Sequence, residues 1–235
     1  MTGRFTLVSF DLDGTLVDTV TEIAEAVNRT LAELGLPRQA GDAVQRRIGA
    51  GTRELLLTLL RDLGREQGAV EGLDRDDALR RFDVHYAATA GTCCLPYPHV
   101  ADALDRLRRG GVRLACVTNK EMRFTTPVLG ACGLDRAFDL IVGGDSLTVK
   151  KPDGDVLRHV MRVLRARAEA TAHVGDSRID VEAARNAGVA AWAVPYGYNG
   201  GDPIEASAPD RLFAHAGEVA DTVLGRTALG RPAPG

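Results

Sequence analysis

Two aspartates separated by one residue, Asp11 and Asp13, are the first side chains in this sequence that could do chemistry. They follow an apolar run over residues 5–9 that predicts a buried strand, and the alternation of side chains along a strand places both carboxylates on the same side. Gly14 lets the backbone turn sharply and direct peptide N–H groups towards an anion. Neighbouring carboxylates repel each other unless a cation or a shared proton separates them. The pattern therefore indicates a reactive site, with a plain polar turn as the alternative.

A third aspartate, Asp176, also follows an apolar strand pattern, and no capping role explains its side chain. A third carboxylate beside Asp11 and Asp13 is best explained by a hard divalent cation with oxygen ligands, for which we predict Mg²⁺. Asp180 has two interpretations. It could complete a capping box with Ser177 at the start of the next helix, or it could belong to the site.

Thr118 follows a further apolar strand. Its hydroxyl could cap a helix or, together with the N–H of Asn119, hold a phosphoryl oxygen. Arginine supplies nearly all basic residues, and the only lysines are Lys120, Lys150 and Lys151. A lysine is therefore less readily explained here as general surface charge, and its ammonium suits a phosphate. Lys151 is the candidate for neutralising a transferring phosphoryl group, but spacing leaves open whether it or Lys150 points inward.

The elements that must position these side chains follow an α/β pattern. Apolar strand patterns alternate with helical patterns, which implies a Rossmann-like parallel sheet with helices on both faces. Ligands of such sheets bind outside the carboxyl ends of the strands, where all these candidates fall. The expected strands cover residues 5–9, 112–117, 138–142, 172–174 and 189–194, with a weak sixth at 211–213, and the helices between them cover 99–109, 122–132, 153–165, 178–187 and 218–224.

The block after the first strand is entirely helical, and we expect no strand between residues 17 and 90. We interpret this block as an inserted helical domain, with helices over residues 23–34, 41–47, 52–63 and 74–90. The predicted boundaries are 1–16 and 94–225 for the α/β core, 17–93 for the inserted domain, and 226–235 for a disordered tail rich in Gly, Pro and Ala.

Composition excludes several classes of protein. The chain has 235 residues, of which 45% are hydrophobic and 26% charged, as is ordinary for a globular protein. Its net charge of −3 argues against nucleic-acid binding. No apolar run reaches the roughly 18 residues that span a bilayer, and the N-terminus lacks a signal-peptide pattern, so we expect a cytoplasmic protein that binds no membrane. The four cysteines lack zinc-ligand spacing and are expected to be reduced.

The segments that hold the candidate site residues resemble, in order along the chain, the four motifs of the haloacid dehalogenase (HAD) superfamily. FDLDGTL at residues 10–16 resembles the first motif, and the segments around Thr118, Lys151 and Asp176 resemble the other three. The resemblance extends from about residue 5 to residue 224. Further strings resemble bacterial phosphoglycolate phosphatases, namely those at residues 23–37, 48–53, 118–120, 143–146 and 196–199.

The resemblance implies a phosphatase that forms an aspartyl-phosphate. Asp11 would attack phosphorus, and Asp13 would protonate the leaving alkoxide and then deprotonate the attacking water. Mg²⁺ would be held by Asp11, Asp176 and the backbone carbonyl of Asp13. Asp180 would orient Asp176 or a metal-bound water, and the sequence leaves open whether it touches the metal.

The resemblance also implies which residues bind the phosphate. Thr118, Asn119 and Lys151 would stabilise the phosphoryl oxygens, and Gly14 and Thr15 would belong to the loop that faces the substrate. The substrate would be a small phosphorylated metabolite, with 2-phosphoglycolate as the first choice.

The inserted helices resemble the cap of this superfamily, which closes over the core and excludes water. Within it, Arg53 could bind a substrate carboxylate, or it could be a solvated side chain at the start of a helix. The sequence does not distinguish a monomer from a homodimer.

Other functions share parts of this pattern. The alternative is a HAD phosphatase or phosphomutase acting on a sugar phosphate, a nucleotide or pyrophosphate. A phosphomutase would need a base in the cap, and the helical setting of the candidate, His85, favours packing instead. Asp13 argues against a haloacid dehalogenase, and the inserted helices argue against a phospho-receiver module. His99 and the segment 153–154 depart from the phosphoglycolate phosphatase pattern and bear on the substrate rather than on the reaction.

Overall fold

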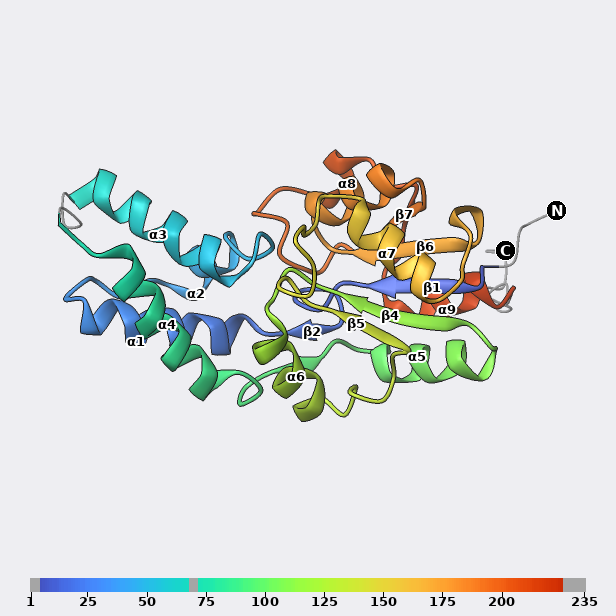
Figure 1. Cartoon of the computed structure of the whole chain (residues 1–235), viewed down its shortest axis with the longest axis horizontal. Coiled ribbons are helices and arrows are strands. Elements are labelled where there is room, and N and C mark those ends of the chain that lie inside the picture. The colour runs from blue at the N-terminus through green and yellow to red at the C-terminus, as the bar shows by residue number, and fades with distance from the viewer. Residues whose placement is uncertain (1–4, 68–71, 226–235) are drawn as a thin grey trace, which may run out of the picture.

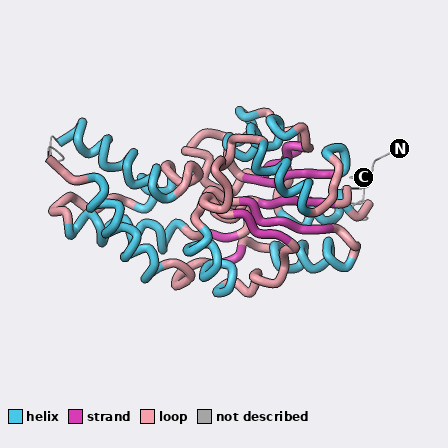
Figure 2. The backbone as a smooth tube through the Cα atoms, in the orientation of Figure 1, coloured by secondary structure: helices cyan, strands magenta, loops and turns pink. Residues whose placement is uncertain are grey.

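The computed structural model describes residues 5–67 and 72–225. These residues form two regions, a sheet covered by helices and a group of four helices beyond one end of the strands (Figures 1 and 2). The predicted tail at 226–235 lies outside the described residues. None of the helices in the described ranges has the length and apolar character needed to cross a membrane.

A six-stranded parallel sheet forms the centre of the larger region, as predicted, and the order of its strands is β5–β4–β1–β6–β7–β8. The central strand, β1, is buried along its whole length, which explains its continuous apolar sequence. Its Ser9 lies opposite Ala115 on one side and His173 on the other. The strands are β1 (Leu7–Phe10), β4 (Arg113–Val117), β5 (Leu140–Val142), β6 (Thr171–Gly175), β7 (Ala190–Ala193) and β8 (Arg211–Leu212).

Helices cover both faces of this sheet (Figure 1). Alternate residues of β1 face opposite sides, so Val8 joins one apolar cluster and Leu7 joins the other. The cluster around Val8 includes α5 (Val100–Arg109) and α9 (Ala216–Val223), and the cluster around Leu7 includes α7 (Asp155–Val163) and α8 (Arg178–Ala187). Helix α6 (Met122–Ala131) contacts the helical group through α4.

The helical group consists of α1 (Val20–Glu33), α2 (Gly41–Gln45), α3 (Thr52–Gln67) and α4 (Arg75–Thr89). It lies at the left of Figure 1, beyond the carboxyl end of β1, and α1 packs along α4. The apolar cluster around Val8 continues into this group through Ile23 and Leu55, so the two regions share one core. The division into domains at residues 16/17 and 93/94 stays a prediction.

The chain enters the helical group through β2 (Val17–Asp18) and leaves it before β3 (Leu95–Pro96), and these two short strands pair antiparallel. Our expectation of no strand between residues 17 and 90 was therefore wrong at β2. Two residues are too few to show a period of two, and their pairing depends on the return of the chain many residues later.

Candidate active site

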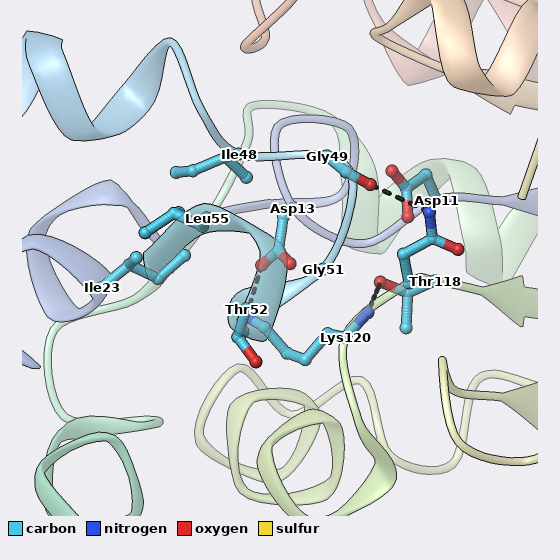
Figure 3. A pocket seen from close by; sticks show the side chains of 11 residues that line it. Asp11, Asp13, Ile23, Ile48, Gly49, Gly51, Thr52, Leu55, Thr118 and Lys120 are labelled. Carbon is cyan, nitrogen blue, oxygen red and sulfur yellow. Dashed lines mark hydrogen bonds and ion pairs between the residues drawn. The ribbon is translucent and has the colours of Figure 1, made fainter. Parts of the chain in front are cut away.

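The carboxyl ends of three neighbouring strands bring the predicted residues together. Asp11 follows β1, Thr118 follows β4, and Asp176 follows β6. Asp11, Asp13, Thr118 and Asn119 line one small cavity that is partly open to solvent, and Figure 3 shows its lining. The cavity lies between the sheet edge and the helical group, because residues of α1 and α3 complete its lining.

A tight loop after Asp11 is folded against Asp176. Gly14 has a φ of +82°, and a Cβ at this position would collide with the carboxylate of Asp176, so only glycine fits. The Thr15 hydroxyl donates to Asp176 Oδ1 at 2.8 Å. The N–H of Leu12 donates to Asp11 Oδ1 at 2.7 Å. The structure therefore places Gly14 and Thr15 beside a predicted metal ligand, and their contact with the substrate stays a prediction.

Three buried carboxylates form a cluster at this edge. Single oxygens of Asp11, Asp176 and Asp180 all lie within 4.8 Å of one another. Asp180 Oδ2 accepts from the N–H of Ser177 at 3.1 Å and from its hydroxyl at 2.6 Å, so the predicted backbone contact of a capping box is present. Asp180 thus takes part in the cap of α8 and also faces the cluster. The capping role and the role in the site are therefore compatible.

Of Lys150 and Lys151, it is Lys151 that points towards the carboxylate cluster. Its Nζ lies 2.9 Å from Asp11 Oδ1 and 2.7 Å from Asp180 Oδ1, and its side chain is almost fully buried. The ammonium of Lys150 instead donates to the backbone oxygen of Ala50 at 2.7 Å, in the loop before α3. The choice that spacing left open is decided by the direction of the two side chains.

The charges of this cluster do not balance within the chain. Burial raises the pKa of Asp11 to about 7 against the opposing effect of Lys151. Burial, Asp180 and Asp11 raise the pKa of Asp176 well above its usual range. Burial would also raise the pKa of Asp180, but Lys151 and His173 together hold it below its usual value. When ionised, three carboxylates beside one ammonium leave two negative charges, and a divalent cation with oxygen ligands fits this donor set.

The carboxylate of Asp13 lies outside this cluster and is held by other partners. Lys120 Nζ lies 2.5 Å from Asp13 Oδ1, and the Thr19 hydroxyl donates to the same oxygen at 2.6 Å. Lys120 is 1% exposed, and although burial alone would lower its pKa, Asp13 and Tyr86 raise it well above the usual value. We did not assign Lys120 to the site from the sequence. The scarcity of lysine was the signal that could have identified it.

Thr118 and Asn119 lie at the end of β4. The hydroxyl of Thr118 accepts from the N–H of Lys120 at 3.2 Å, and α6 begins farther along, so the alternative of a helix cap was wrong. The side-chain Nδ2 of Asn119 donates to Gly49 O at 3.0 Å and to Lys151 O at 2.9 Å. Asn119 therefore ties the loop before α3 to the core, which the sequence did not reveal.

The wall of the cavity on the side of the helical group is mainly aliphatic. Ile23, Ile48 and Leu55 lie across the cavity from Asp11 (Figure 3). Arg53 does not line the cavity, and its side chain is exposed. The structure brings the other predicted residues to this edge of the sheet and leaves Arg53 outside.

Two histidines that bear on the choice of reaction or substrate, His85 and His99, lie away from the cavity. His85 Nε2 lies 3.0 Å from Glu33 Oε1, so its contact is within the helical group, as its helical setting indicated. His99 has a φ of +68°, a conformation that favours glycine, and its ring packs on His215 with 4.3 Å between centroids. Neither histidine lines the cavity.

Tyr198 is a second residue that we did not assign to the site. Its N–H donates to Asp176 Oδ2 at 2.6 Å, while its hydroxyl donates to Asp18 Oδ1 at 2.5 Å and accepts from Thr19 N at 2.9 Å. Tyr198 thus joins a carboxylate of the cluster, through its backbone N–H, to the strand that leads into the helical group, through its hydroxyl. The string at residues 196–199 was noted only for its resemblance, and no spacing rule points to these contacts.

The fold and the site together define an α/β enzyme with buried aspartates at the carboxyl edge of a parallel sheet and helices inserted after its first strand. A family model for haloacid dehalogenase-like hydrolases matches residues 8–194, and the chain belongs to this family.

The chain is similar both to curated protein sequences and to solved structures. The phosphoglycolate phosphatase of Pseudomonas putida is 40% identical over 231 residues, which cover 94% of this chain and 82% of that protein. The plasmid-encoded phosphoglycolate phosphatase of Cupriavidus necator is 42% identical over 195 residues, with 83% of each chain covered. The crystal structure of a predicted phosphoglycolate phosphatase from Haemophilus somnus 129PT has a TM-score of 0.88 at 31% identity, and the match covers 94% of this chain and 99% of that one.

Proposed function

We propose that this protein is a Mg²⁺-dependent phosphomonoesterase that hydrolyses 2-phosphoglycolate to glycolate and phosphate. The observation that carries the proposal is the buried carboxylate of Asp11, which contacts the Lys151 ammonium beside two further buried carboxylates. The curated relatives named phosphoglycolate phosphatase support the choice of substrate. The location in the cytoplasm and the choice between monomer and homodimer stay predictions.

Asp11 is the nucleophile in this proposal. Lys151 and the N–H of Leu12 both contact its Oδ1, so we assign the attack on phosphorus to Oδ2. Attack forms the bond from Oδ2 to phosphorus and breaks the bond from phosphorus to the ester oxygen of the substrate. Lys151 and the hydroxyl of Thr118 stabilise the charge on the phosphoryl oxygens during this transfer.

Asp13 moves the protons. Its acid form gives a proton to the leaving ester oxygen, which departs as the hydroxyl of glycolate. The resulting carboxylate then takes a proton from the water that attacks phosphorus, and this second step releases phosphate and restores Asp11. Lys120 and Thr19 both contact Asp13 Oδ1 and fix the direction of this carboxylate.

The residues that would hold Mg²⁺ are Asp11, Asp176 and the backbone carbonyl of Asp13. The cation would neutralise the charge that accumulates between these carboxylates and the phosphate. Asp180 contacts Lys151, His173 and Ser177, and we assign it to holding Lys151 in place rather than to the metal.

The first test is phosphate release by the purified protein, measured with Mg²⁺ and again after EDTA treatment. The panel holds 2-phosphoglycolate, glucose 1-phosphate, nucleoside monophosphates and pyrophosphate. We expect kcat/KM for 2-phosphoglycolate to exceed the others at least tenfold, and we expect EDTA to abolish and Mg²⁺ to restore turnover. Even activity over the panel would contradict the substrate, and no release from any compound would contradict the reaction.

A further inference from the structure

Lys120 is the only cationic side chain among the described residues that line the active-site cavity. It is 1% exposed, although a buried ammonium is costly unless it is paired. Its contact with Asp13 explains the pairing but not the choice of lysine, because a neutral donor could hold the same oxygen, as Thr19 does. A buried cation that also faces the cavity requires a further explanation.

The ammonium has more donors than its protein partners use. It carries three N–H groups and no acceptor, Asp13 Oδ1 takes one of them, and the Tyr86 hydroxyl is within reach of a second, so one N–H is left. The ring of Tyr86 lies with its centroid 5.4 Å from Nζ, on the side of α4. Glu22 is the other acidic group that faces Lys120, and burial raises the pKa of its carboxyl, which disfavours the charged form. Lys120 therefore keeps capacity for an anion on the cavity side.

The rest of the wall limits what else the leaving group can contain. Ile23, Ile48 and Leu55 offer no hydrogen bonds, and the hydroxyl of Thr52 already donates to Glu121 Oε2 at 2.6 Å. Hydroxyls of a sugar that face this aliphatic part of the wall would lose water without gaining partners, which disfavours sugar phosphates. A short apolar link that ends in one anionic group matches this wall.

We propose that Lys120 determines specificity by binding the carboxylate of the leaving group, so that the cavity selects phosphate esters of short 2-hydroxy acids. In such esters the carboxylate carbon is two bonds from the ester oxygen. Asp13, which would protonate that oxygen, is in contact with Lys120. The ammonium therefore lies close to the position that the carboxylate of the substrate would take. This assignment rests on the proposed function, and it gives Lys120 the role that the sequence suggested for Arg53.

The test compares two substrates that differ only in the group at the far end, which is a carboxylate in 2-phosphoglycolate and a methyl group in ethyl phosphate. Lys120→Met removes the ammonium, while Thr19→Val removes the other partner of Asp13 Oδ1 and leaves the cavity charge unchanged. We expect K120M to lower kcat/KM for 2-phosphoglycolate by about 10- to 100-fold more than for ethyl phosphate, because a charge-assisted hydrogen bond is lost with one substrate only. T19V should lower both values by the same factor.

Each outcome has a separate meaning. Equal losses on both substrates in K120M would show that Lys120 only positions Asp13, and the inference would be overturned while the phosphatase function stood. If the wild-type protein did not hydrolyse 2-phosphoglycolate at all, the proposed function itself would fail. Circular dichroism of both variants verifies that they fold.

A measurement on the wild-type protein keeps the inference testable if K120M does not fold. O-phosphoethanolamine carries a cation where 2-phosphoglycolate carries its carboxylate. We expect kcat/KM to fall in the order 2-phosphoglycolate, ethyl phosphate, O-phosphoethanolamine, because Lys120 attracts the first and repels the last. Turnover of O-phosphoethanolamine as fast as that of 2-phosphoglycolate would overturn the inference.

Discussion

At the scale of single residues, the chemistry depends on the partners that stabilise carboxylates which repel one another. Asp11 is 7% exposed, and burial raises its pKa to about 7, while the ammonium of Lys151 opposes that rise. Within the described part of the chain no ammonium contacts Asp176, which accepts from Thr15 and from the N–H of Tyr198 instead. This unequal support suits one carboxylate that attacks and another that binds a cation.

Asp11→Asn tests the nucleophile. The amide keeps the shape of the side chain but cannot form the aspartyl-phosphate, so we expect kcat on 2-phosphoglycolate to fall by at least about 10³-fold. The far-ultraviolet circular dichroism should not change. The matched control is Asp155→Asn at an exposed aspartate that pairs with Arg158, and it should keep activity within twofold. Near-normal activity in D11N would contradict the assignment.

At the scale of elements, the register between β1 and β6 continues the site into the sheet. It places Ser9 opposite His173, and Ser9 Oγ lies 2.9 Å from His173 Nδ1. His173 Nε2 lies 3.3 Å from Asp180 Oδ1, which also contacts Lys151. Desolvation by burial lowers the pKa of His173, so the neutral ring is the form that this arrangement favours.

The lowered pKa of His173 predicts how stability depends on pH. As the pH falls below about 6.5, His173 binds a proton in the unfolded chain but stays neutral in the folded protein. The free energy of unfolding therefore decreases. Above that pH the histidine is neutral in both states and contributes no slope. His173→Gln should therefore show a smaller decrease than the wild-type protein between pH 7.5 and pH 5.5, measured by urea unfolding without Mg²⁺. Parallel curves for the two proteins would contradict this prediction.

At the scale of the whole molecule, the helical group and the sheet meet at the cavity and are joined by few chain crossings. The strands β2 and β3 form the two crossings, and one apolar core continues between the regions. Across the cavity, Asn119 contacts Gly49 and Lys150 contacts Ala50. Tyr198 links the first crossing to Asp176, so the position of the helical group is coupled to the carboxylate cluster.

Tyr198→Phe tests this coupling. The substitution removes the hydroxyl that contacts Asp18 and Thr19 but keeps the N–H that donates to Asp176. We expect kcat/KM to fall by about 5- to 20-fold, because the crossing no longer has a fixed position relative to the cluster.

The control for this variant is Tyr196→Phe. It also removes a hydroxyl with a backbone partner, Thr15 O at 2.9 Å, but it leaves both crossings untouched. Thermal unfolding should show similar losses of stability for the two variants, with activity close to wild type in Y196F alone. Equal losses of activity would indicate a general packing effect.

The sequence was sufficient to predict the sheet, its flanking helices and the edge at which the candidate site lies. Apolar strands alternating with helices permit few arrangements, and parallel strands place the residues after them at one edge, so Asp11, Thr118 and Asp176 had to meet. The helices inserted after the first strand could also be predicted from the sequence, because four amphipathic segments without a strand pattern cannot extend the sheet.

Which side chains reach that edge depends on the folded structure. Lys120 and Asp13 are 107 residues apart, and Tyr198 lies 180 residues from Asp18. Such pairs depend on the direction of each side chain after the chain has folded, and local spacing carries no information about it. The same reason explains why Lys151 points inward rather than Lys150, and why Arg53 faces solvent while its neighbours on α3 line the cavity.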